Sequence, residues 1–111
     1  MLLITKEIAK AFETQGYTGE TPPDEIKVIC KLFNPAGAGT WYLYEQVDED
    51  IYYGFVNLGD SRFAECGTVS LGELKNLRLP LGLSIERDRS FPVGKYTLQY
   101  VRDRVKSGGH V

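Results

Sequence analysis

The spacing of hydrophobic residues changes from helical to strand-like within the first third of the chain. Ile4, Ile8 and Phe12 recur every four residues, which places them on one face of a helix. Thr5 is suited to cap the start of this helix, and Gly16 is suited to end it. We therefore predict a first helix that ends at the residue before Gly16.

Period-two patterns predict a series of strands after this helix. The segment 26–33 alternates apolar residues with Lys27 and Lys31, so both lysines are expected to face solvent. Later segments are rich in aromatic and β-branched residues and are separated by short turns. The predicted strands are residues 26–33, 40–47, 51–58 and 63–69, with a short edge strand at 83–85. Such short connections favour antiparallel neighbours in a meander.

Two helix signals follow the predicted strands. Ser70-Leu71-Gly72-Glu73 has the sequence of a capping box, in which the serine caps the helix and the glutamate reaches back to the serine N–H. Leu98, Val101 and Val105 fall on one face of a helix near the end of the chain. The sequence therefore predicts a short helix after residue 70 and a closing helix.

These elements predict one domain of the α+β class. The chain has 111 residues, which is enough for one hydrophobic core and too few for two. We expect an antiparallel four- or five-stranded meander sheet packed with two or three helices over residues 1–106. Residues 107–111 are rich in glycine and are expected to form a flexible tail.

The balance of charge disfavours two classes of partner. Thirteen lysines and arginines oppose fifteen aspartates and glutamates, which gives a formal net charge of -2. No bulk electrostatic attraction therefore draws the chain to nucleic acid or to an anionic membrane. The sequence has neither a run of about 18 apolar residues nor a secretory signal pattern, so we expect a cytoplasmic protein with no membrane partner.

Catalytic and metal-binding patterns are weak. His110, the single histidine, lies in the glycine-rich tail, where nothing in the sequence would hold it as a base. Cys30 falls in an apolar strand pattern, and Cys66 has no paired base beside it. These three residues lack the close spacing of a zinc site, and only a carboxylate brought near by folding would complete one. We predict a protein that is not an enzyme and needs no cofactor, with the zinc question open.

Aromatic residues are concentrated in the two central predicted strands, 40–47 and 51–58. A small core is not expected to hide both faces of such a ribbon, so some tyrosines should be exposed. The alternative is cross-strand pairing that only stabilises the sheet. The first interpretation predicts a partner-binding surface made of Trp41, Tyr42, Tyr44, Glu45, Asp48, Glu49 and Asp50.

The charged run Glu86-Arg87-Asp88 is a second candidate site. An arginine between two carboxylates is able to form a bidentate clamp for a partner. It is equally able to form a solvated or internally paired turn. Nothing in the sequence fixes which face these side chains take, so both interpretations stay open.

Several short motifs spread along the chain resemble one known family. They are Lys31-Leu32-Phe33-Asn34-Pro35, Thr40-Trp41-Tyr42 with Glu45, Gly67-Thr68-Val69-Ser70-Leu71-Gly72-Glu73-Leu74, and Gly82-Leu83-Ser84-Ile85-Glu86-Arg87-Asp88 with Phe91. In combination they make the chain similar to the domain of unknown function 2958 family over nearly its whole length. The resemblance implies a setting on plasmids and integrative conjugative elements of bacteria, and it brings no catalytic motif with it.

The resemblance and the residues together give two functional hypotheses. Small proteins of mobile elements often counter host defence by covering a nuclease. The first hypothesis is therefore a non-catalytic inhibitor of the anti-CRISPR or anti-restriction kind, or an adaptor, that binds a host or element-encoded protein. The second is a nucleic-acid-binding accessory in replication or transfer, in which tyrosines stack on bases and Arg102, Arg104 and Lys106 contact phosphates. The acidic net charge favours the first.

Overall fold

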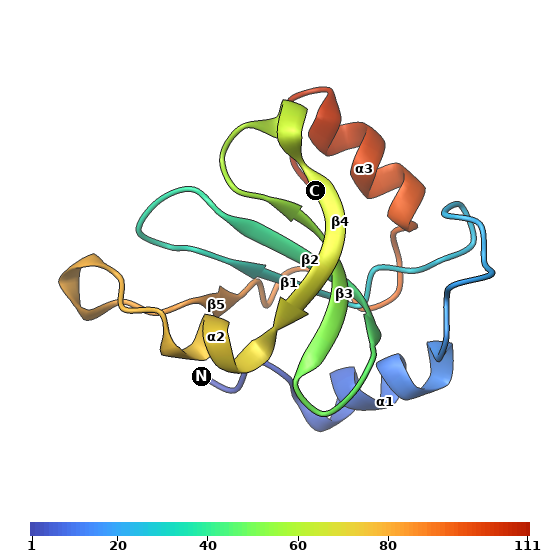
Figure 1. Cartoon of the computed structure of the whole chain (residues 1–111), viewed down its shortest axis with the longest axis horizontal. Coiled ribbons are helices and arrows are strands. Elements are labelled where there is room, and N and C mark those ends of the chain that lie inside the picture. Colours follow the sequence, from blue (N-terminus) through green and yellow to red (C-terminus); the bar gives the residue numbers. More distant parts are fainter.

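The computed structural model describes residues 1–111, which fold as a sheet with helices on both sides (Figure 1). Its elements are α1 (Lys6–Gln15), β1 (Cys30–Phe33), β2 (Thr40–Gln46), β3 (Ile51–Asn57), η1 (Ser61–Phe63), β4 (Glu65–Ser70), α2 (Leu71–Asn76), η2 (Pro80–Gly82), β5 (Glu86–Arg87) and α3 (Leu98–Lys106). The longest helix, α1, has ten residues, and no helix has the length and apolar composition needed to cross a lipid bilayer.

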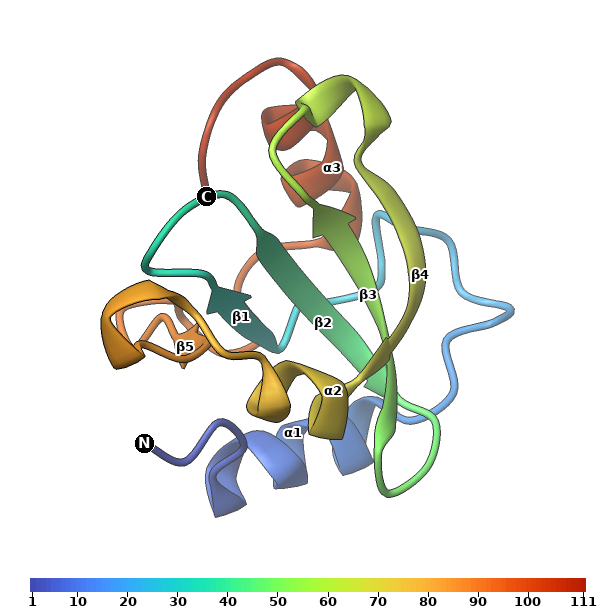
Figure 2. The same ribbon diagram turned by 60° about the vertical axis from the view of Figure 1, so that its left-hand side comes forward.

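The five strands form one antiparallel sheet in the order β4-β3-β2-β1-β5. Short turns join β1 to β4 as a meander, and β5 pairs with the free side of β1 (Figure 2). The predicted α+β class and the predicted antiparallel meander are therefore confirmed. The two edges of the sheet differ in length, because β5 has two residues whereas β4 has six.

Helices cover both faces of the sheet, so the molecule has three layers (Figures 1 and 2). α1 and α2 lie against one face, where Phe12, Leu43 and Leu74 belong to one buried cluster. α3 lies against the other face, where Phe55 and Val101 belong to a second cluster. Both faces of the aromatic ribbon are covered, contrary to the expectation for so small a core, because α3 packs opposite α1. Tyr53 of the ribbon is nevertheless 38% exposed, so the expectation that some tyrosines are exposed is confirmed.

The first and last helices begin and end at residues suited to that role. The Thr5 hydroxyl accepts from the N–H of Ile8 at 3.2 Å, and Gly16 ends α1 with a φ of 65°. At α3 the hydroxyl of Thr97 accepts from the N–H of Tyr100 at 3.0 Å. Local capping chemistry therefore sets these helix ends, and the predicted first helix is confirmed.

The serine half of the predicted capping box of α2 forms, and a different carboxylate supports it. Ser70 Oγ accepts from the N–H of Glu73 at 3.2 Å, as the motif predicts. The carboxylate of Asp50, in the β2–β3 turn, accepts from the Ser70 hydroxyl at 2.5 Å and from the N–H of Gly72 at 2.7 Å. A carboxylate from another element therefore caps this helix start, at the Ser70 hydroxyl and the Gly72 N–H, and not at the Ser70 N–H expected to bind Glu73.

The first strand is shorter than predicted. It begins at Cys30, because the backbone of Val28 is bonded to the segment before α3. The Val28 N–H donates to the carbonyl of Tyr96 at 2.9 Å, and its carbonyl accepts from Gly94 at 3.1 Å. Val28 accordingly packs in the α3 cluster, whereas Cys30 packs in the α1 cluster. The chain changes the face that it buries between these two residues.

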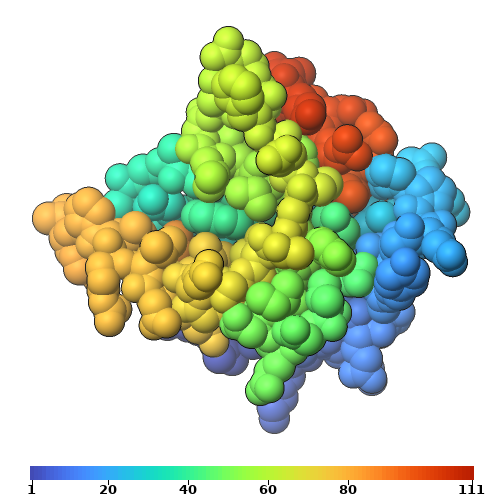
Figure 3. All heavy atoms as spheres, viewed as in Figure 1, coloured from blue at the N-terminus to red at the C-terminus, as the bar shows by residue number.

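The edge strand lies later in the chain than predicted. Residues 83–85 follow the turn η2, which projects from the body of the molecule (Figure 3), and form no strand. Ile85 is buried in the α1 cluster, and Glu86–Arg87 pair with β1 instead. Lys31 of β1 was expected in solvent but is half-buried, and its ammonium group lies 3.3 Å from the carboxylate of Asp88. This ion pair joins the segment after β5 to strand β1 of the sheet.

The C-terminal residues 107–111, predicted as a tail, fold back on the molecule. The N–H of Gly109 donates to the carbonyl of Arg104 at 2.8 Å. The Val111 carbonyl accepts from Lys31 Nζ at 2.7 Å, and the Val111 side chain packs against the α3 cluster. The tail therefore covers part of the same core that α3 covers.

Candidate protein-binding site

The aromatic residues predicted to bind a partner lie in the centre of the sheet. β2 runs between β1 and β3, and helices cover both of its faces. Four of the predicted residues are buried: Trp41, Tyr42, Tyr44 and Glu45. The expectation that these four form an exposed surface is wrong. The alternative interpretation, pairing within the sheet, describes their packing.

The acidic residues of that prediction are exposed in the β2–β3 turn. The carboxylate of Asp48 accepts from the N–H groups of Asp50 and Ile51 at 2.9 and 2.8 Å, which shapes the turn. Asp50 also caps α2. Glu49 lies between them in solvent. The turn therefore presents negative charge on a backbone shaped by these hydrogen bonds.

The run Glu86-Arg87-Asp88 makes internal contacts. The guanidinium group of Arg87 donates to the carbonyls of Leu2 and Leu3, the second at 3.1 Å. Asp88 pairs with Lys31. Arg87 and Asp88 line a different hollow from Glu45 and Asp48, so the structure does not bring the two candidate sites together. Internal pairing is the interpretation that these contacts support.

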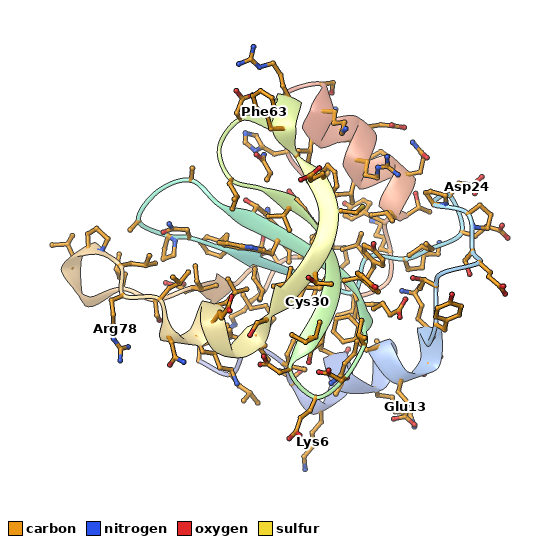
Figure 4. The ribbon with its side chains drawn as sticks, viewed as in Figure 1. Lys6, Glu13, Asp24, Cys30, Phe63 and Arg78 are labelled. Atoms are coloured by element: carbon orange, nitrogen blue, oxygen red, sulfur yellow. The ribbon has the colours of Figure 1, made fainter.

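A groove of about 730 Å³ opens between the C-terminal end of α1 and the β2–β3 turn. Three of its lining residues are carboxylates, three are aromatic and none is basic. These six residues are Glu13, Glu45, Asp48, Phe12, Tyr17 and Tyr53. We call this hollow the acidic groove. Figure 4 shows Glu13 on the solvent side of α1.

Negative potential in the acidic groove has two sources. The first is the set of three carboxylate side chains. The second is the C-terminal end of α1, whose free carbonyls bear a partial negative charge, and the last turn of this helix contains no basic residue. A cation in the groove is attracted by both, and no lining residue opposes it.

Glu45 is the fixed carboxylate of the acidic groove. The pairing of β2 with β3 shifts by one residue between Leu43 and Glu45, and such a bulge redirects the side chains beside it. Glu45 is 6% exposed, and its Oε1 accepts from the N–H and the hydroxyl of Thr18 at 2.8 and 2.5 Å. Hydrogen bonds to an ionised group are among the stronger ones in proteins, so they hold this carboxylate in place.

Tyrosines form the aromatic wall of the acidic groove. The rings of Tyr44 and Tyr53 stack with centroids 6.4 Å apart and planes 14° apart. Burial raises the pKa of the Tyr44 phenol, and the neighbouring Cys66 and Glu45 raise it further, so Tyr44 is a neutral hydroxyl at neutral pH. Tyr53 is partly exposed, and Tyr17 is 72% exposed. These two rings are therefore available to a ligand.

A smaller hollow of about 350 Å³ continues from the acidic groove toward β4. It shares Tyr17, Glu45 and Tyr53 with the groove and adds Cys66 of β4 and Arg102 of α3. Its lining contains one acid and one base, so its charge is balanced. The preference for a cation therefore belongs to the acidic groove alone.

Gln15 is a positioning residue that sequence reasoning missed. Its side-chain amide donates to the carbonyls of Lys27 and Tyr44 at 2.8 and 2.5 Å and accepts from the N–H of Lys27 at 2.8 Å. These bonds fix the end of α1 against the sheet, which sets the width of the acidic groove. The only local feature that could have indicated this role is the position of the glutamine, directly before Gly16 at the end of the helix.

The thiols and the histidine do not gather into one site. Cys30 is buried, and burial raises its pKa to about 12, so the thiol stays protonated at neutral pH. Cys66 is exposed on β4, and His110 lies in the C-terminal segment. No three side chains of the His, Cys, Asp and Glu type lie together in an arrangement that would hold a metal ion.

Comparison with known proteins places the chain in a family. No curated protein and no solved structure matches it. One family model, described as "Protein of unknown function (DUF2958)", matches residues 3–111, which is nearly the whole chain. The match covers every helix and strand described above. The chain therefore belongs to the DUF2958 family, as the motifs in its sequence predicted.

Proposed function

We propose that this protein acts without turnover, by binding a basic surface of another protein in the acidic groove. The observation that supports this proposal is the lining of the groove, which contains three carboxylates and no basic residue, with the exposed rings of Tyr17 and Tyr53 beside them. Arginine and lysine side chains fit such a lining, because they pair with carboxylates and stack on tyrosine rings.

The role we propose is a counter-defence inhibitor of the anti-CRISPR or anti-restriction kind, encoded by a mobile genetic element and acting in the cytoplasm. Nucleases hold nucleic acid in positively charged channels. An acidic groove on a small protein is complementary to the rim of such a channel, and complementary charge speeds association and selects the partner. A protein that covers the channel needs no catalytic residues.

The direct test measures DNA cleavage by purified restriction and CRISPR nucleases while this protein is titrated. The double variant Glu13→Gln with Asp48→Asn removes two charges from the groove and keeps the Asp48 side-chain oxygen that accepts in the turn. We expect the half-inhibitory concentration to rise about tenfold, which corresponds to ~1.4 kcal/mol. Higher salt should weaken inhibition by the native protein more than inhibition by the variant.

The matched control is Glu7→Gln with Glu73→Gln, which removes the same charge from exposed positions outside the groove. It should inhibit as well as the native protein does. Equal losses in both double variants would show that net charge matters and the groove does not. Native protein that neither inhibits nor binds any of the nucleases at micromolar concentration contradicts the proposed role.

One observation favours nucleic-acid binding as the second candidate. Tyr100 on α3 is partly exposed and stacks on Tyr96 with ring centroids 5.3 Å apart, and Arg104 and Lys106 are exposed on the same helix. An exposed tyrosine beside cations is able to stack on a base while the cations contact phosphates. Binding of an oligonucleotide that weakens steeply with salt, in the absence of any bound nuclease, would favour this candidate.

A further inference from the structure

The strand β4 is an open edge of the sheet. It pairs with β3 over six residues, and no strand lies on its other side. Figure 3 shows its atoms, in yellow, on the surface of the molecule. Proteins commonly protect such an edge with lysine, proline or a bulge. The segment Glu65–Ser70 contains neither residue, and its pairing has no register shift.

The register shows which backbone groups of β4 are free. The N–H of Leu71 donates to the carbonyl of Asp50 at 2.9 Å, so the preceding residue, Ser70, is in a non-hydrogen-bonded pair with β3. Such pairs alternate with hydrogen-bonded pairs along an antiparallel ladder. Cys66 and Thr68 are therefore also in non-hydrogen-bonded pairs, and their N–H and C=O groups point away from β3.

An apolar pocket of about 340 Å³ lies beside this edge, over Gly67. Val56, Leu58 and Phe63 form its apolar part, and Leu58 and Phe63 are 71% and 76% exposed. Figure 4 shows Phe63 at the upper end of the connection between β3 and β4. A Cβ atom added at Gly67 would meet no atom within 4 Å, so the space above this residue is open.

The side chain of Glu65 lies on the face of the sheet that a side chain at position 67 would occupy, because alternate residues of a strand share a face. Glu65 is exposed and lines the same pocket. A chain paired with β4 would place one side chain opposite Gly67, in the apolar pocket, and the side chain two residues away opposite the Glu65 carboxylate.

We propose that β4 receives an extended segment of the partner protein as an added strand, with a large apolar side chain opposite Gly67 and a lysine or arginine opposite Glu65. Free N–H and C=O groups at Cys66 and Thr68 bind the backbone of that segment, and the pocket and the carboxylate select its side chains. The proposal rests on the protein-binding function above and adds the partner segment that this second surface recognises.

Short blocked peptides test this proposal without the natural partner. One peptide has Lys-Thr-Phe at its centre and the other has Phe-Thr-Lys, which present the same two side chains in the two strand directions. Amide NMR spectra of the full chain, with its thiols kept reduced, follow each titration. We expect one of the peptides to shift the Cys66 and Thr68 amide signals and to slow their hydrogen exchange. Replacing its Phe by Ala or its Lys by Glu should weaken binding at least about tenfold.

Two variants of the protein identify the edge as the site. Thr68→Pro removes an N–H that points away from β3, and Thr68→Ala keeps it, so the proline variant alone should lose the peptide. Gly67→Val fills the open space of the pocket, and a valine suits a strand. It should also lose the peptide while its spectrum stays that of the folded protein.

The following results would overturn the proposal. The first is the absence of amide shifts with either peptide at millimolar concentration. The second is equal peptide binding by the proline and alanine variants. The third is a dimer of the native chain in sedimentation that Thr68→Pro alone fails to form, because β4 would then pair with a second copy of this chain. Failure here is distinguishable from failure of the proposed function, because nuclease inhibition is measured separately. If the groove variant loses inhibition but still binds the peptide, the two surfaces act separately and β4 is unaffected. If the native protein inhibits the nuclease but binds neither peptide, the proposal for β4 is wrong and the proposed function stands.

Discussion

Leu81 adopts a backbone conformation that residues with a side chain rarely occupy. Its φ is 63° and its ψ is 24°, and the next residue, Gly82, also has a positive φ. The N–H of Leu83 donates to the carbonyl of Pro80 at 3.2 Å and closes the turn. Positive φ at both central positions defines a type I′ turn, which favours Asn, Asp or Gly. Leu81 is 95% exposed, so no packing offsets its strain.

Replacing this leucine should therefore stabilise the protein. A left-handed conformation costs an ordinary residue about 1–2 kcal/mol, and asparagine tolerates it better. We expect Leu81→Asn to raise the free energy of unfolding by about 0.5–1 kcal/mol in a urea titration, by relief of part of that strain. The matched control is Leu77→Asn, at an exposed position with an ordinary φ of -63°. Unfolding at a lower urea concentration than the native protein would contradict this account of Leu81.

The β2–β3 turn and α2 are joined by the carboxylate of Asp50. Its hydrogen bonds with the Ser70 hydroxyl and, next in importance, with the Gly72 N–H lower its pKa. A carboxyl group whose pKa is lower in the folded state stabilises that state above its unfolded pKa of about 4. The stabilisation is lost as the pH falls through the folded pKa, because the neutral acid no longer accepts these bonds as strongly.

Asp50→Asn tests this coupling between two elements. The variant should be less stable than the native protein at neutral pH, and the difference should shrink as the pH falls below about 4. Thermal unfolding followed by circular dichroism at several pH values measures it. Glu49→Gln removes a charge from the same turn without touching the cap and should leave the acid side of the curve unchanged. A difference that stays constant down to acid pH would show that the carboxylate charge of Asp50 has no part in the cap.

The elements that were predicted well depend on local signals. Thr5 and Gly16 lie next to the helix they limit, and the turn residues lie between the strands they separate. The contacts that sequence reasoning missed join distant positions. Gln15 reaches Tyr44, Asp50 reaches Ser70, and Arg87 reaches the N-terminal segment. No local pattern encodes such pairs.

The sequence of β2 contained a pattern that indicates burial on both faces, and it was interpreted as an exposed surface. Its residues Trp41 and Leu43 alternate with Tyr42 and Tyr44, so neither face of the strand is polar. A strand that is apolar on both faces is typical of the middle of a sheet covered on both sides. The structure has this arrangement, and the surface that remains for a partner comes from the ends and the edge of the sheet. The acidic groove itself combines α1 with the β2–β3 turn, which only the fold brings together.

The two buried clusters share one sheet, which makes them parts of one cooperative unit. Trp41, the single tryptophan, belongs to the cluster beneath α1, whereas Val101 belongs to the cluster beneath α3. β2 contributes Trp41 and Leu43 to the first cluster and Tyr42 and Tyr44 to the second. Loss of packing on either face therefore loosens the strand that supports the other face.

Val101→Ala tests this cooperativity across the sheet. Val101 is fully buried, so removing two carbon atoms should lower the free energy of unfolding by about 2 kcal/mol. We expect tryptophan fluorescence, which reports on the opposite face, to shift by the same amount as far-ultraviolet circular dichroism in a urea titration. Lys106→Ala, at an exposed position on the same helix, should change stability by less than about 0.5 kcal/mol. If fluorescence keeps the native midpoint while circular dichroism shifts, α3 unfolds separately, and the sheet does not couple the two layers.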